Sequence, residues 1–190
     1  MTTRVVGVVL FVVVSLNAPV TAQTDKAKGK ETFPVNEKVV AFAKKSLGEK
    51  VGNGECWTLA NDALKSAGGK SSPAYRDTPN EGDYVWGELV YGREVKNGKL
   101  IETGNAKLKV VPGDIVQFRG SRFAGPRADG GTYTMTAAHH TAIVVNTTPD
   151  GKVFAILHQN SNGNKTVAEA MLTLTDLKEG WVKIYRPAME

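Results

Sequence analysis

The sequence predicts an α+β fold in which N-terminal helices pack on a curled antiparallel sheet. Two segments with the apolar spacing of helices lie before residue 68, and short strand-like runs separated by hairpin turns follow from Tyr84 onward. Helices that come first and antiparallel strands that come after are typical of this class. The chain has 190 residues, which is room for one domain with a tail.

Residues 1–22 have the pattern of a secretory signal peptide. Arg4 precedes the apolar run Val5–Leu16, and the small residues Val20-Thr21-Ala22 follow it. As a helix this run would cover roughly 18 Å, short of the roughly 30 Å of a bilayer core, which disfavours a membrane anchor. A buried strand is the other interpretation. We therefore expect a secreted or periplasmic protein without a membrane span after signal removal.

The expected domain covers residues 35–187, after a polar, lysine-rich linker over residues 23–34. Apolar residues at helical spacing predict a first helix over about Glu37–Leu47, with Asn36 as its N-cap. A second helix is predicted over about Glu55–Ala67, ended by Gly68-Gly69.

Turn residues divide the rest of the chain into strands. Asn97-Gly98 and Pro149-Asp150-Gly151 each predict a hairpin between alternating runs. Further strands are predicted at Ile115–Phe118, Thr141–Asn146, Lys152–Gln159, Thr166–Leu174 and Trp181–Tyr185. Gly120–Ala138 is rich in Gly and Arg with little periodicity, and we expect a long irregular loop there.

Composition excludes several classes of protein. A single cysteine excludes an internal disulfide framework, and a net charge of +5 is too small to identify an anionic partner. The chain has no nucleic-acid-binding motif and no phosphate-binding loop, so no nucleic acid is expected. Cys56, His140 and His158 could together hold zinc, but no HExxH-type motif accompanies them, and neither metal nor cofactor is expected.

Cys56 is the candidate nucleophile because it lies in the first turn of the second predicted helix. Unpaired backbone N–H groups and the positive end of the helix dipole favour a thiolate there, and the same N–H groups can hold an oxyanion. The alternative is a small buried apolar residue, which is the more common state of a lone cysteine.

His140 is the candidate base. The strand period of two puts it on one face with Ala142 and Val144, and small Ala142 would leave room for a facing helix. His139 points the other way and is expected to be exposed. His158 and Asn160 share a face of the partner strand, where either could hydrogen-bond His140 and orient it.

Three further residues are expected to contact a substrate: Asn160, Trp57 and Arg122. Arg122 belongs to a group of arginines before His140 that could clamp a carboxylate. The alternative is an exposed, solubilising loop.

These segments resemble the NlpC-type and CHAP branch of papain-like cysteine hydrolases. The matching motifs are Gly54-Glu55-Cys56-Trp57, Gly113-Asp114, His140-Thr141-Ala142-Ile143-Val144 and His158, and the resemblance covers about Val35–Pro187. The chain also resembles the cysteine-proteinase-fold domain of certain fungal actin-patch proteins. The resemblance implies Cys56 as nucleophile and His140 as base, with His158 or Asn160 as the third member.

The expected function is that of an exported cysteine hydrolase, a peptidase or amidase, that cleaves amide bonds of cell-wall peptide or a similar substrate. Cys56 would attack the carbonyl, and His140 would move the proton to the leaving amine. The alternative is a catalytically silent papain-fold module that binds peptide or glycan. In either case the partner is a peptide or peptidoglycan-like molecule, and the protein is expected to be a monomer.

Overall fold

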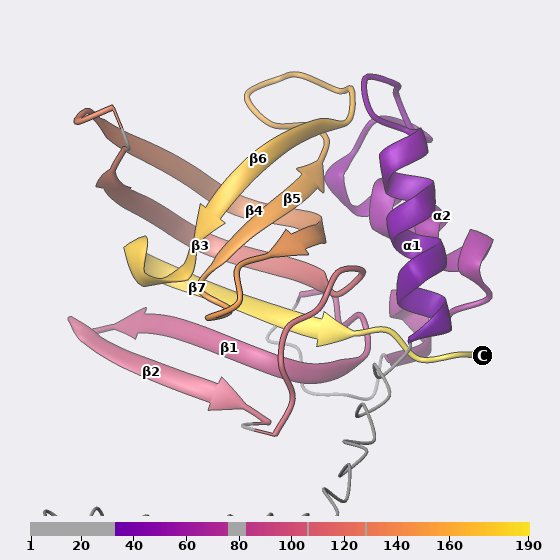
Figure 1. Ribbon diagram of the computed structural model, residues 1–190, viewed down its shortest axis with the longest axis horizontal. Helices are drawn as coiled ribbons and strands as arrows, with labels where there is room; N and C mark the ends of the chain where they lie inside the picture. The colour runs from indigo at the N-terminus through magenta and orange to yellow at the C-terminus, as the bar shows by residue number, and fades with distance from the viewer. Residues whose placement is uncertain (1–32, 76–82, 106, 128) are drawn as a thin grey trace, which may run out of the picture. The chain divides into compact units, whose positions relative to one another are not determined.

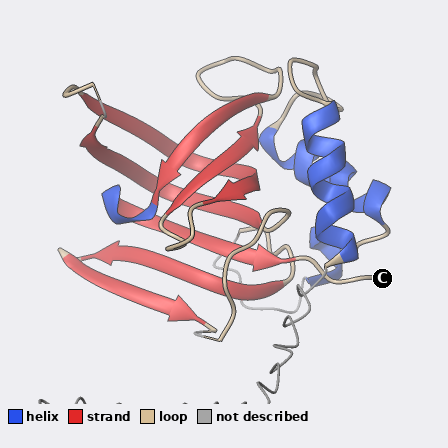
Figure 2. Cartoon of the chain, in the orientation of Figure 1, coloured by secondary structure: helices blue, strands red, loops and turns tan. Residues whose placement is uncertain are grey.

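A computed structural model describes residues 33–75, 83–105, 107–127 and 129–190. The signal peptide predicted at residues 1–22, and the linker up to residue 32, lie outside the described residues. Within them, two α-helices lie on one side of a seven-stranded antiparallel sheet (Figures 1 and 2). The chain order of helices first and strands afterwards agrees with the predicted α+β class.

The helices are α1 (Pro34–Lys45) and α2 (Cys56–Ala67). α1 begins earlier than predicted because Pro34, whose fixed φ suits a first helical position, starts it after Phe33. Asn36 is therefore inside the helix and is not its N-cap; its amide donates to the Asp114 carboxylate. α2 ends as predicted, since Gly68 adopts the left-handed conformation at φ 73°.

The strands run antiparallel in the order β2-β1-β7-β3-β4-β5-β6. Two short 3₁₀ helices accompany them, η1 (Ser72–Tyr75) and η2 (Leu174–Asp176). The strands are β1 (Glu88–Lys96), β2 (Lys99–Gly104), β3 (Ile115–Pro126), β4 (Thr132–Thr147), β5 (Val153–His158), β6 (Ala168–Thr173) and β7 (Leu177–Arg186). Both predicted hairpin turns join neighbouring strands of this sheet.

The irregular loop predicted over Gly120–Ala138 is wrong, because most of this segment is a long β-hairpin. β3 and β4 remain in register from Ile115↔Ile143 to Pro126↔Thr132. Phe123, in the middle of the segment, is fully buried in the core. Glycines with φ of 54° at Gly120 and 83° at Gly130 interrupt the apolar alternation that would have indicated strands.

The sheet separates two hydrophobic cores. One lies under the helices and contains Ile143 and Leu157; the other lies on the far face and contains Ala142 and Val144. The expected helix facing Ala142 is therefore wrong, since α1 and α2 cover the opposite face of β4. His140 lies on the far face, where its ring is 6.0 Å from that of Phe118.

The described residues contain no helix with the length and apolar character needed to cross a bilayer.

Candidate functional site

Cys56 is the first residue of α2, directly after the extended N-cap Glu55. Its side chain is buried, with 9% of the residue exposed. Burial raises the pKa of the Cys56 thiol, and Glu55 raises it further; the N–H groups of Thr141, Trp57 and Cys56 itself act in the opposite direction without offsetting the burial. The thiol is therefore protonated at neutral pH.

His140 and His158 form a hydrogen-bonded pair across the far face of the sheet. Nε2 of His140 lies 2.9 Å from Nδ1 of His158, and the two rings meet edge to face. Burial, followed by the neighbouring His158 and His139, lowers the pKa of His140 to about 4. Burial also lowers the pKa of His158. Both imidazoles are neutral at pH 7, so one ring nitrogen of the pair donates and the other accepts.

The first residue of α2 lies next to β4 at the point where β4 is no longer paired with β5. Pairing of β4 with β5 begins at Ile143↔Leu157, so the N–H of Thr141 is available to a group outside the ladder. That N–H is directed at Cys56 Sγ. The thiol therefore lies beside the Thr141 backbone on the helix side of β4, whereas the side chains of His140 and His158 meet on the far face of the sheet.

Asn160 was expected to contact substrate or to orient His140, but its side chain is hydrogen-bonded to Glu55 instead. Its amide donates to Glu55 Oε2 over 2.6 Å, and Nζ of Lys165 lies 3.0 Å from Oε1 of the same carboxylate. These two contacts hold the segment that follows β5 against Glu55, the residue before Cys56.

Gln159, which sequence reasoning did not select, connects the same segments. Its Nε2 donates to the carbonyls of Val51 and Glu55, and its Oε1 accepts from the N–H of Val51. Nε2 also lies 2.9 Å from the hydroxyl of Thr58 in the first turn of α2. Only its place between His158 and Asn160 could have drawn attention to it.

We expect Gln159→Ala to lower the free energy of unfolding by about 2 kcal/mol, because it removes a buried amide and leaves its backbone partners unpaired. Urea denaturation followed by circular dichroism measures this. The matched control is Asn146→Ala, which removes an exposed amide whose oxygen accepts from the N–H of its neighbour Thr147 and should change stability by less than about 0.5 kcal/mol. Equal losses in both variants would contradict the role given to Gln159.

Trp57 and Arg122, the other expected contacts, lie in different surroundings. Trp57 is half-buried and stacks on Tyr84 at 6.2 Å. Arg122 is engaged with Glu179 through Nε and Nη2, at 2.9 and 2.6 Å from Oε1. Arg122 is therefore held by a neighbouring strand and does not line the hollow beside His140.

His139 faces the helix side of β4, as its register predicts, and is exposed as expected, with 38% of its side chain accessible. Nε2 of His139 is 2.6 Å from Oδ1 of the buried Asp83, and its ring stacks on Tyr84 at 5.5 Å. Gln117 donates to the same Oδ1 and accepts from Trp86 and Thr141. This buried network, which the sequence analysis missed, fixes β4 on the side of the thiol.

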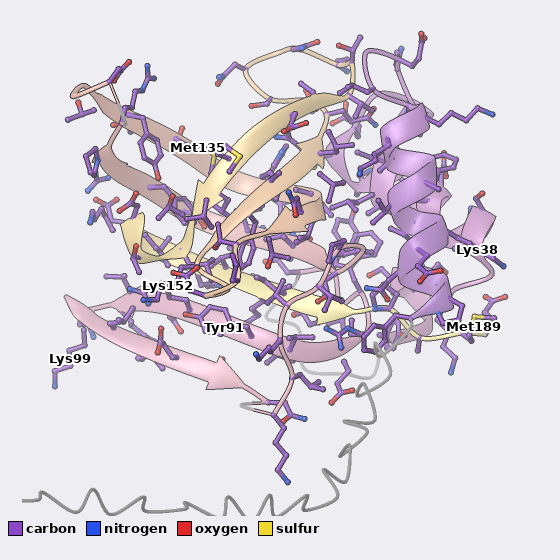
Figure 3. All side chains as sticks on the ribbon, viewed as in Figure 1. Lys38, Tyr91, Lys99, Met135, Lys152 and Met189 are labelled. Carbon is purple, nitrogen blue, oxygen red and sulfur yellow. The ribbon has the colours of Figure 1, made fainter. Side chains whose placement is uncertain are left out.

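A hollow of about 140 Å³, here called the histidine pocket, opens beside the imidazole pair. Its walls are one stretch of β4, Met135–His140, and the segment that follows β5, with His158, Asn160, Ser161 and Asn162. Met135 is labelled in Figure 3. Cys56 does not line the pocket. Within the described residues no group of three His, Cys, Asp or Glu side chains is arranged to hold a metal ion.

A cysteine that begins a helix packed on an antiparallel sheet is the arrangement of the cysteine-proteinase folds. The chain belongs to the AIM3/BBC1 cysteine proteinase-fold domain family, which matches residues 27–190. It is 32% identical over 152 residues to "Altered inheritance of mitochondria protein 3" of Debaryomyces hansenii. The match covers 80% of this chain and 16% of that relative, so the chain corresponds to a small part of it.

The chain is less similar to the solved structures that it matches than to the family and the relative named above. The crystal structure of Ly7917 matches with a TM-score of 0.42 and 18% identity, over 80% of this chain and 62% of that one. The structure of Ly7917 with the hydrolysing product of MDP matches with a TM-score of 0.45 and 18% identity, over 80% and 63%.

Family membership corrects the functional expectation. The predicted exported cysteine hydrolase of the cell wall, of NlpC or CHAP type, is wrong, and so is the predicted secreted or periplasmic location, because the chain belongs with AIM3/BBC1 domains. The resemblance to the domain of fungal actin-patch proteins is confirmed. The Cys-His pattern alone could not separate these groups, because the motifs of this sequence resemble both.

Proposed function

We propose that this domain is a papain-like module that binds an extended peptide segment at the histidine pocket without cleaving it. The observation that carries the proposal is that both His140 and His158 line this pocket while Cys56 does not. A carbonyl held there would meet an imidazole but no sulfur. Cleavage by a cysteine nucleophile needs both within reach of one atom.

The protonation states support the same conclusion. An efficient cysteine nucleophile is a thiolate, which a neighbouring positive charge stabilises. Here burial favours the neutral thiol, and the pKa of His140, about 4, keeps the imidazole uncharged. Cys56 therefore lacks the charge of an activated thiolate, and His140, on the other face of the sheet, has no positive charge that could stabilise one.

One edge of β4 is open, and a peptide could bind there as an added strand. Residues 132–141 of β4 pair with β3 on one side, whereas pairing with β5 on the other begins only at Ile143. Within the described residues no strand occupies that second edge. An added strand would bond its backbone there, and one of its side chains would enter the histidine pocket.

The resemblance to fungal actin-patch proteins suggests the setting. We infer that the module acts in the cytoplasm as one part of a longer protein, where it binds a segment of a partner in a cytoskeletal assembly. The relative's much greater length supports this inference.

A thiol probe tests the catalytic half of the proposal. We expect an aromatic disulfide reagent at pH 7 to label Cys56 at least about tenfold more slowly than free cysteine, because the thiol is buried and protonated. His140→Ala should change the labelling rate less than twofold. Fast labelling that His140→Ala abolishes would instead indicate an activated nucleophile.

Peptide display tests the binding half. Peptides selected on the purified chain should lose at least tenfold in affinity with Ala138→Trp, which fills the pocket. Cys56→Ser should bind normally, and so should the matched control Leu100→Trp, at an exposed position of β2 away from the pocket and from the open edge of β4. Mass spectrometry of the bound peptides completes the test, because cleavage that depends on Cys56 would overturn the proposal.

A further inference from the structure

The lining of the histidine pocket limits the kind of side chain that can enter it. Among the described residues that line it there is no Lys, Arg, Asp or Glu. Part of its wall is apolar, because Phe118, Ala137 and Ile156 belong to the core of the far face and Met135 packs against that core. A charged side chain would meet no counter-charge there, so its burial would cost free energy. The pocket therefore suits a neutral side chain with an alkyl stem.

The two imidazoles are the polar groups of the pocket that a ligand must satisfy. At the rim, the Asn160 carboxamide is held by Glu55, and Asn162 is exposed, so that water can bond it. His158, in contrast, is buried, and His140 is half-buried. A ligand that displaces water from these rings must replace the hydrogen bonds that the water made.

The imidazole pair presents one donor and one acceptor to a ligand. A neutral imidazole has one N–H and one unprotonated nitrogen. The bond between Nε2 of His140 and Nδ1 of His158 uses one N–H and one unprotonated nitrogen. If His140 donates in this bond, its Nδ1 is left as an acceptor and Nε2 of His158 as a donor. If His158 donates, the two roles are exchanged, so one donor and one acceptor remain in either case.

Geometry and charge favour a ligand group that donates from one atom and accepts at another. The two rings meet at 88° with their centroids 5.1 Å apart, so the two remaining nitrogens belong to different planes. Burial lowers the pKa of both rings, that of His140 to about 4, which keeps the pair neutral at pH 7. The carboxamide of Gln or Asn has a donor and an acceptor on separate atoms. A carboxylate has no donor, an ammonium group has no acceptor, and a hydroxyl uses a single oxygen for both.

We propose that the histidine pocket selects a glutamine or asparagine side chain of the bound peptide, whose carboxamide bonds Nδ1 of His140 and Nε2 of His158 together. The alkyl stem of that side chain packs on Phe118 and Met135. The carboxamide binds in either orientation, because the two tautomers of the pair exchange donor and acceptor. This inference rests on the peptide binding proposed above and adds the side chain that the pocket recognises.

A randomised decapeptide library displayed on phage tests this, since selection on the purified chain should enrich Gln or Asn at one fixed position. Synthetic versions of a selected peptide with Glu or Leu at that position should bind at least about tenfold more weakly by fluorescence anisotropy, because each leaves a ring nitrogen unpaired. The variant His140→Phe/His158→Phe removes all four ring nitrogens but keeps aromatic side chains, so it should bind the Gln and Leu versions within about twofold of each other. Leu100→Trp, the matched control on β2, should keep the full preference.

Enrichment of a charged or an apolar residue at the fixed position would overturn the proposal, and so would an unchanged preference in the double histidine variant. Peptide binding that Ala138→Trp abolishes would in those cases leave the function proposed above intact. Failure of every peptide to bind, or binding that Ala138→Trp leaves unchanged, would instead refute that function and this inference with it. The comparison of the Gln, Glu and Leu versions on the parent chain decides the question even if the double variant does not fold.

Discussion

Replacing Asp114 by alanine should lower the free energy of unfolding by about 3–5 kcal/mol, because it breaks a buried ion pair by removing one partner. Asp114 is fully buried and accepts from Nε and Nη2 of Arg186 at 2.8 and 3.0 Å. It also accepts from the Asn36 amide in α1 and from the N–H of Val111. The variant would leave the guanidinium buried without its counter-charge and the Asn36 amide short of a partner.

Urea denaturation of the variant measures this loss. Glu179→Ala, which breaks the exposed ion pair with Arg122, is the matched control and should cost less than about 1 kcal/mol. Asp114→Asn should fall between the two, since it keeps the shape but loses the charge. A loss for Asp114→Ala no larger than that of the control would contradict the structural role of the pair.

The same contacts explain the Gly113-Asp114 motif that the sequence analysis singled out. Gly113 has φ 90°, and a Cβ there would lie 2.4 Å from the carbonyl oxygen of Asn36. The motif therefore lets the start of β3 approach α1 closely and ties it there. Its place beside the site residues in the sequence pattern reflects the assembly of the fold, not contact with a ligand.

Elements set by local chemistry were predictable from the sequence. Asn97-Gly98 forms the β1–β2 turn with positive φ at both residues, and Gly68 ends α2 in the left-handed conformation. The first turn of α2 likewise holds Cys56 as predicted. Each of these depends on residues only a few positions apart.

Features set by distant contacts were not predictable. Ala142 and Ile143 are both apolar and both buried, so periodicity could not indicate which face of β4 the helices cover. The network around Gln117 joins it to Trp86 and Asp83, which are more than thirty positions away, without any short motif. Residue types likewise could not indicate that Cys56 lies outside the lining of the histidine pocket.

Acid should destabilise the protein through the His140–His158 pair. In the unfolded chain histidine has a pKa of about 6.5, whereas burial and the neighbouring His158 lower the pKa of His140 in the folded protein to about 4. Between these values the unfolded state binds a proton that the folded state does not, so stability is lost as the pH falls. The difference amounts to about 3 kcal/mol for His140, and His158, whose pKa burial also lowers, adds to the loss in the same direction.

Urea denaturation at pH 7 and at pH 4 measures this loss, and the variant His140→Gln/His158→Gln isolates it. The variant retains side chains that can bond one another but removes both titrating rings, so its stability should fall by at least about 3 kcal/mol less than that of the parent chain over this pH range. His139→Gln is the matched control, since it removes an exposed imidazole on the other face of β4, a minor cause of the lowered pKa of His140, and keeps the His140–His158 hydrogen bond. A double variant that loses stability in acid as steeply as the His139→Gln control would show that the pair is already charged in the folded protein. The neutral His140 imidazole that is cited in support of the non-catalytic interpretation would then be wrong as well, because burial would not have lowered the pKa of its ring.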